Sequence, residues 1–268
     1  MDIQLLLNSL LVGICCYFGA IESPWLLGMT GGFYIMGRPL IAGFLIGLIF
    51  GDVQTGILCG LAVQAVFIAN LSTGGATNSE ITYAGYGGIG IAMATTKDPA
   101  LAVTLSVLVG QTFGLVFYNT RMAAYSFWNS RCDKAAKDVD LRGITFNHII
   151  GPQMTTFILR ALPVMFLIYF GRGFVEFLIT NMPPLVTNII SVLGGVLPAL
   201  GIGMLMTIII KEKIHLIFFL FGFAVIAFLN INMIGLVIFA LLVSYIVYLS
   251  FGNNKNSSEV DSDYDEVI

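Results

Sequence analysis

Long uncharged stretches dominate the chain from Ile3 to Phe251 and constrain its fold more than any other feature. Only 10% of the 268 residues are charged, whereas soluble globular domains carry about 25%. A helix that spans a membrane needs about 20 mostly apolar residues, a length that several of these stretches reach. We therefore expect an all-α, polytopic integral membrane protein, and the composition excludes a soluble enzyme.

Charge is concentrated at the C-terminal end. Residues 252–268 hold five acids and one lysine, so they contribute −4 to a total of −3 and leave +1 for the remainder. That remainder has no basic surface for nucleic acid. We expect a membrane-embedded domain over residues 1–252 and a disordered acidic tail over 253–268. The N-terminus lacks the basic region of a cleaved signal peptide, so the first apolar run is expected to remain a membrane segment.

Several uncharged stretches are interrupted or have the wrong length for one crossing. Pro39–Gly51 is too short to cross, whereas Ile214–Phe251 can hold two crossings with a turn at Asn230–Asn232. Val53–Thr96 is rich in glycine around a polar stretch, and Met182–Pro198 is a weaker counterpart in the second half. Paired interruptions of this kind point to a transporter's binding site, so we expect broken or re-entrant helices in inverted-repeat-like halves. The alternative is that the glycines only allow close packing of helices.

The segment of about 121–142 carries five of the chain's twelve lysines and arginines. Basic residues favour the cytoplasmic side of a membrane, so we expect a cytoplasmic loop here. Its aspartates nearly balance the charge, which suits a short surface helix.

Ionisable residues within apolar segments usually face a partner or a pathway, and here they are Glu22, Asp52, Glu80, Arg160 and Glu176. Asp52 has a second interpretation as a helix cap. We expect Arg160 and Glu176 to form a structural ion pair across a hairpin, and Glu22 to mark an interface boundary.

Gln64 and Glu80 flank the glycine-rich interruption, with Asn70 and Asn78 between them. Amides combined with one or two carboxylates suit a polyhydroxylated ligand, because each sugar hydroxyl both donates and accepts hydrogen bonds. The sequence therefore predicts a site at Gln64, Asn70, Asn78 and Glu80, on a turn supported by Asp52, Gly74 and Gly75.

Other chemistry has no support in the sequence. The four cysteines lack the spacing of metal ligands, and His148 and His215 are expected to be interfacial residues. Gly85–Gly90 fits a dinucleotide-binding pattern but lacks the strand–helix context. We expect no cofactor, no metal site and no catalytic nucleophile.

Four motifs in order resemble the IIC subunits of mannose-type sugar permeases of the bacterial phosphotransferase system. They are Arg38–Ile41 leading to Gly51–Gly56, the glycine-rich segment after Gln64, Cys132–Ala136, and Gly194–Met206. The resemblance extends over essentially Ile3–Phe251.

The resemblance implies a multi-pass subunit of the bacterial cell membrane that moves a sugar inward in a phosphoenolpyruvate-dependent system. It also implies a hetero-oligomer with a IID membrane subunit, and phosphorylation of the sugar by cytoplasmic IIA and IIB subunits. Gln64 stands where mannose-specific members have a glutamate, and Glu80 where they have an aspartate, so a related hexose or an amino sugar is as consistent with the resemblance as mannose. The alternatives are an ion-coupled secondary transporter and a non-transporting membrane scaffold.

Overall fold

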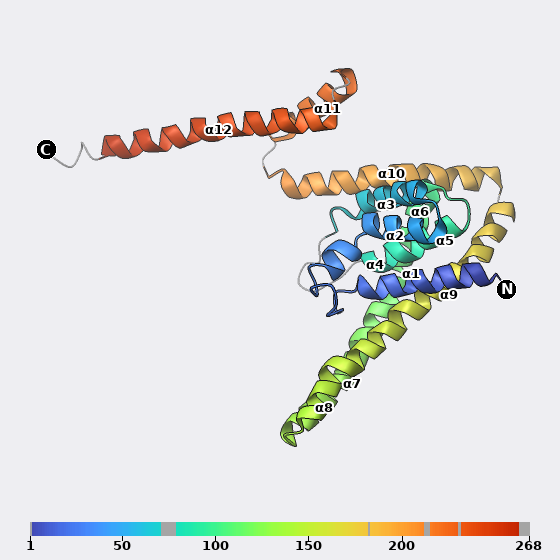
Figure 1. Ribbon diagram of the computed structural model, residues 1–268. Coiled ribbons are helices and arrows are strands. Elements are labelled where there is room, and N and C mark those ends of the chain that lie inside the picture. Colours follow the sequence, from blue (N-terminus) through green and yellow to red (C-terminus); the bar gives the residue numbers. More distant parts are fainter. Residues whose placement is uncertain (1, 71–78, 182, 212–214, 230–231, 263–268) are drawn as a thin grey trace. The chain divides into compact units, whose positions relative to one another are not determined.

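The computed structural model describes residues 2–70, 79–181, 183–211, 215–229 and 232–262 (Figure 1). Every regular element within these ranges is a helix, which confirms the all-α prediction. The chain divides into two units, Met1–Met206 and Thr207–Ile268. The helices of the first unit, including the three π-helices η1 to η3, are α1 (Ile3–Phe18), η1 (Gly32–Met36), α2 (Pro39–Phe50), α3 (Val53–Phe67), α4 (Ile81–Tyr83), η2 (Ala84–Ile89), α5 (Gly90–Ala94), α6 (Pro99–Gln111), α7 (Phe113–Lys137), α8 (Leu141–Thr145), η3 (Phe146–Ile150), α9 (Gly151–Asn181) and α10 (Pro184–Ile209).

Three helical stretches among the described residues are long and apolar enough to cross a membrane: Pro99–Lys137, Leu141–Phe177 and Asn188–Ile209. The helices α1, α2 and α3 are apolar but shorter. This mixture of long and short apolar helices agrees with the expectation of broken membrane segments.

The α2–α3 hairpin is tight because glycines from the two helices face each other. Gly51 turns the chain with a φ of 75°, a conformation that glycine adopts without steric cost. A methyl group on Gly56 would lie 2.6 Å from the Gly47 Cα, and one on Gly60 would lie 2.7 Å from the Pro39 carbonyl oxygen. These glycines therefore serve close packing of helices, as the alternative interpretation stated.

A short, fully enclosed segment follows the interruption after α3. It consists of α4, the π-helix η2 and α5, and every residue from Ser79 to Met93 is buried. At about 1.5 Å per residue Ile81–Ala94 is roughly 20 Å long, which is too short to cross a hydrocarbon layer of roughly 30 Å. The first half of the chain thus contains the broken helix that the glycine-rich stretch predicts.

The second interruption differs from the prediction. The helix α10 continues from Pro184 to Ile209 with Pro198 inside it, so Gly194–Pro198 does not break the helix. The helix α9 ends at Asn181 and α10 begins at Pro184. This junction is the part of the predicted counterpart, Met182–Pro198, at which the helices are interrupted.

The charged segment 121–142 is mostly helical, which agrees with the helix expected within it. The helix α7 runs through it to Lys137, a turn with Val139 at a φ of 55° follows, and α8 and η3 lead into α9. The helices α7 and α9 lie side by side in this hairpin (Figure 1). Alanine, arginine and lysine are good helix formers, so the charges here do not end the helix. The cytoplasmic location of the segment stays a prediction.

The second unit contains α11 (Leu216–Leu229) and α12 (Met233–Ser262). The expected turn at Asn230–Asn232 falls between them, although residues 230 and 231 lie outside the described residues. Asn232 accepts a hydrogen bond from the Ile234 N–H at 3.3 Å at the start of α12. The helix α12 continues to Ser262, which lies within the predicted tail. The disorder expected from residue 253 onward remains a prediction.

Candidate functional site

A cavity of about 360 Å³, called the polar cavity below, lies where four segments of the first unit meet. The chain after α1, the π-helix η1, the ends of the interruption after α3, and α7 all contribute to it. Its lining combines charged, amide and hydroxyl groups with apolar side chains: Ile21, Glu22, Phe33, Asn70, Ser79, Glu80, Ile81, Tyr118, Arg121 and Met122.

Two carboxylates and two guanidinium groups, called the charge cluster below, meet beside this cavity. Arg160 Nη2 lies 2.7 Å from Glu80 Oε1 and 3.5 Å from Glu22 Oε2, and Arg121 Nη1 lies 2.8 Å from Glu22 Oε1. Glu80, Arg121 and Arg160 are only 5%, 3% and 1% exposed. The two positive and two negative charges balance, as buried ions require.

Both carboxylate oxygens of Glu80 have a partner. Oε1 accepts from Arg160, and Oε2 accepts from the Tyr83 N–H at 2.9 Å, which caps the start of α4. The Glu80 N–H donates to the Gly110 carbonyl at 3.1 Å. A methyl group on Gly114 would lie 2.9 Å from the Glu80 Cβ, so a glycine is needed there to admit this side chain.

The two ends of the segment 71–78 are joined next to Glu80. Asn70 donates from Nδ2 to the Ser79 hydroxyl at 2.9 Å, and both residues line the polar cavity. The structure thus brings together two of the sequence-predicted residues, Asn70 and Glu80. Asn78, Gly74 and Gly75 lie outside the described residues.

The structure does not bring Gln64 or Asp52 to this cavity. Gln64 is absent from the described lining residues, and its amide oxygen is buried on α3 with no hydrogen-bond partner in the described part of the chain. Asp52 caps α3 by accepting from the Thr55 N–H at 3.2 Å. It thus lies at the opposite end of a helix of 15 residues, roughly 22 Å long, from Asn70.

Asp52 also pairs with Lys97 at 3.0 Å. The hydrogen bond from this ammonium group holds the pKa of the Asp52 carboxyl below its usual range. The helix-cap interpretation therefore describes Asp52, which does not contact the turn that carries Glu80.

Sequence reasoning misplaced three members of the charge cluster. Arg160 pairs with Glu80 and Glu22 rather than with Glu176, because Arg160 and Glu176 lie on the same helix and are too far apart. Glu176 pairs instead with Arg172 at 2.9 Å, one helical turn away. Arg121, expected in a cytoplasmic loop, is buried on α7, and Glu22 is its partner rather than a boundary marker. The available signal was that Glu22, Glu80 and Arg160 are ionisable residues within apolar stretches, which usually face a partner.

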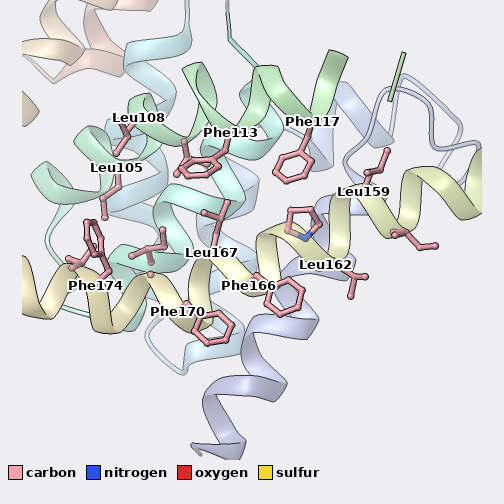
Figure 2. Close-up of a pocket in the computed structure, with 16 residues that line it drawn as sticks. Leu105, Leu108, Phe113, Phe117, Leu159, Leu162, Phe166, Leu167, Phe170 and Phe174 are labelled. Atoms are coloured by element: carbon pink, nitrogen blue, oxygen red, sulfur yellow. The ribbon is translucent and has the colours of Figure 1, made fainter. Parts of the chain in front are cut away.

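A second cavity, called the apolar groove below, has about 730 Å³ and lies between α6–α7 and α9 (Figure 2). Figure 2 shows leucine and phenylalanine side chains from both sides in the space between these helices, among them Leu105, Phe113, Phe117 and Leu167. None of its described lining residues has a polar side chain. The groove is larger than the polar cavity but lacks groups that can hydrogen-bond a sugar.

Comparison with known proteins identifies the family. The family model of the phosphotransferase system sorbose-specific IIC component matches residues 6–246. The N-acetylgalactosamine permease IIC component 1 of Escherichia coli (strain K12) is 29% identical over 199 residues, which are 73% of this chain and 72% of that protein.

Two solved structures share the fold. One, described as "Structure of membrane protein", has a TM-score of 0.72 at 21% identity and covers 93% of this chain and 96% of that one. The other is the cryoEM structure of the mannose transporter ManYZ with microcin E492, with a TM-score of 0.51 at 21% identity and the same coverage.

The match to the family model covers most of the chain, so the resemblance noted in the sequence is confirmed. A IIC component is a multi-pass protein of the bacterial cell membrane and acts in a membrane complex with other components of the system. The chain belongs to the sorbose-specific IIC component family and is the sugar-translocating membrane subunit of a phosphotransferase system.

Proposed function

We propose that the polar cavity binds the sugar that this subunit moves across the membrane. The observation that carries the proposal is the concentration of hydrogen-bonding side chains in the lining of this cavity, namely Glu22, Asn70, Ser79, Glu80, Tyr118 and Arg121. Two of them have further capacity: Arg121 Nε has no hydrogen-bond partner among the described residues, and Glu22 Oε2 has only the ion-pair contact with Arg160 at 3.5 Å. Because a sugar hydroxyl donates and accepts, it can satisfy both kinds of atom. The volume of about 360 Å³ also lies within the range of roughly 300–1,000 Å³ typical of ligand pockets.

Five polar lining residues and Phe33 have distinct roles in this proposal. Glu22 and Glu80 accept hydrogen bonds from hydroxyl groups, and Arg121 donates to a ring or hydroxyl oxygen. Asn70 and Ser79 add an amide and a hydroxyl at the base of the segment 71–78. Phe33 offers an apolar face for the C–H groups of the ring.

The remaining sequence-predicted residues are kept as proposals. Asn78 adjoins Ser79 in the chain and is proposed as a further contact, with Gly74 and Gly75 forming the turn. Gln64 is proposed as a contact outside the described lining, because its buried amide oxygen has no hydrogen-bond partner among the residues that the structure describes.

The balanced charge of the cluster favours a ligand without net charge, such as a hexose or an N-acylated amino sugar. A charged ligand would leave one buried charge without a partner. The names of similar proteins include N-acetylgalactosamine and mannose, so a related hexose or amino sugar is the substrate class that we propose.

We further propose that the subunit forms its complex with a IID membrane subunit, and that cytoplasmic IIA and IIB subunits phosphorylate the sugar as it enters. The chain then needs no phosphorylated residue of its own.

The test is uptake of sugar by cells that produce the chain together with its partner components. Glu80→Gln removes the charge but keeps the size of the side chain, and we expect the KM for the sugar to rise at least tenfold. Glu176→Gln is the matched control, because Glu176 is an exposed carboxylate paired with an arginine on its own helix. Wild-type KM in the Glu80→Gln variant would overturn the proposal.

A further inference from the structure

Arg160 is the central member of the charge cluster and differs from Arg121 in what it faces. Its Nη2 contacts a carboxylate oxygen of both Glu80 and Glu22. Arg121 contacts only Glu22 among the described carboxylates and lines the polar cavity. Arg160 is 1% exposed and is absent from the described lining. It can therefore influence a ligand only through the side chains that it holds.

The carboxylate of Glu80 is oriented from two sides. The Tyr83 N–H at the start of α4 binds one oxygen at 2.9 Å, and Arg160 on α9 binds the other at 2.7 Å. The backbone contact alone leaves the carboxylate free to turn about that oxygen. The guanidinium contact supplies the second fixed point and sets the face that Glu80 presents to the cavity.

Tyr83 in turn holds Arg160 in place. The Arg160 guanidinium lies over the Tyr83 ring, with its Cζ 5.2 Å from the ring centroid. The same ring stacks on Phe117 at 5.7 Å, and the Tyr83 hydroxyl donates to the Leu159 carbonyl on α9. A planar guanidinium can stack and bind a carboxylate at the same time, whereas an ammonium group cannot do so in the same geometry.

We infer that Arg160 is a positioning residue of the sugar site, which sets the orientation of the Glu80 carboxylate without contacting the sugar. This inference rests on the proposed function of the polar cavity. It predicts that a change at Arg160 alters the affinity for sugar through Glu80, and that the effect disappears once Glu80 has lost its charge.

The experiment is a double-mutant cycle on the assembled complex, with the KM and maximal rate of sugar uptake as readouts. The variants are Arg160→Lys, Glu80→Gln and the double variant. We expect Arg160→Lys to raise KM about tenfold while the maximal rate per assembled complex stays within twofold of wild type. In the Glu80→Gln background the same change should alter KM less than twofold, because the two residues act as one unit.

Other outcomes separate the two levels of the proposal. A wild-type KM in Glu80→Gln overturns the proposed function. A raised KM in Glu80→Gln with a wild-type KM in Arg160→Lys overturns only the positioning role. A purely structural role would lower the amount of assembled complex in both backgrounds and leave KM unchanged. Independent action would raise KM by the same factor in both backgrounds, which also contradicts the inference.

Arg172→Lys is the matched control, because Arg172 lies on the same helix and pairs with exposed carboxylates. If Arg160→Lys does not assemble, the comparison is made between Glu80→Gln and Glu80→Gln/Arg160→Gln, which removes both charges of the pair. Equal KM values in these two variants support the inference, and a further rise of fivefold or more contradicts it.

Discussion

The polar cavity and the apolar groove share helix α7, yet they have opposite chemistry. Phe113 and Phe117 line the groove, and Tyr118 and Arg121 line the polar cavity. One helix thus changes from an apolar to a polar environment within about two turns. The larger cavity is the less informative one, because volume without hydrogen-bonding groups gives no specificity for a hydroxylated ligand.

The two regions also differ in what maintains them. The groove consists of apolar side chains, and placing apolar side chains in a membrane protein costs little free energy. Each charge of the cluster costs on the order of 3 kcal/mol to place in a membrane segment, and pairing offsets that cost. A chain that needed only stability would achieve it with apolar side chains, since replacing a buried ion pair by well-packed apolar residues is often neutral or stabilising. The cluster therefore indicates function more strongly than the groove does.

Among the substitutions that test this comparison, Glu80→Ala has the largest expected effect. Glu80→Ala leaves Arg160 with Glu22 as its only described carboxylate partner, and breaking a buried ion pair costs about 3–5 kcal/mol. We expect uptake to fall more than about 100-fold. The measurement is initial uptake rate, normalised to the amount of complex recovered from the membrane. Uptake within threefold of wild type would show that the cluster has no part in transport.

A substitution at Arg121 tests a residue that lines the polar cavity, in contrast to Arg160, which is absent from the described lining. Arg121→Gln keeps a donor but loses the charge paired with Glu22. Hydrogen bonds to charged groups contribute about 1.5–3 kcal/mol, so we expect KM to rise about tenfold or more. Titration of uptake against sugar concentration measures this. An unchanged KM would remove Arg121 from the site.

The apolar groove provides the opposite test. Leu108→Ala removes an apolar side chain from its wall, on the helical stretch Pro99–Lys137 that also carries Arg121. We expect KM for the sugar to stay within twofold of wild type, because the groove does not contact the sugar. A tenfold rise in KM, seen in the same uptake titration, would mean that the polar cavity alone does not form the site.

Asp52 has the smallest expected effect. Asp52→Asn keeps a side-chain oxygen that can cap α3, removes an exposed ion pair with Lys97 at the far end of that helix, and leaves KM unchanged. Because the folded-state pKa of Asp52 is lowered, its stabilisation is present above the unfolded-state pKa of about 3.9 and is lost as the pH falls through the folded-state pKa. Thermal melting of the wild type and the variant should differ slightly at pH 7 and converge below about pH 4. A difference that grows on acidification would contradict this.

Sequence alone predicted the local features of this protein. The membrane class, the broken segment after α3 and the helix-cap interpretation of Asp52 follow from patterns within a few residues. The glycines of α2 and α3 matched the packing interpretation.

The charge cluster was beyond sequence reasoning because its members come from distant parts of the chain. Glu22, Arg121 and Arg160 meet only after α1, α7 and α9 have packed, and spacing in the sequence does not specify their partners. Likewise Pro198 does not interrupt α10, because the effect of a proline in a membrane helix depends on its surroundings.

The most direct test of the account is a structure of the complex with its sugar bound. We predict density for the sugar in the polar cavity, within hydrogen-bond distance of Glu80 and Arg121, with Arg160 behind Glu80 and out of contact with the ligand. Density for the sugar elsewhere, with the cavity filled by protein side chains, would contradict the account.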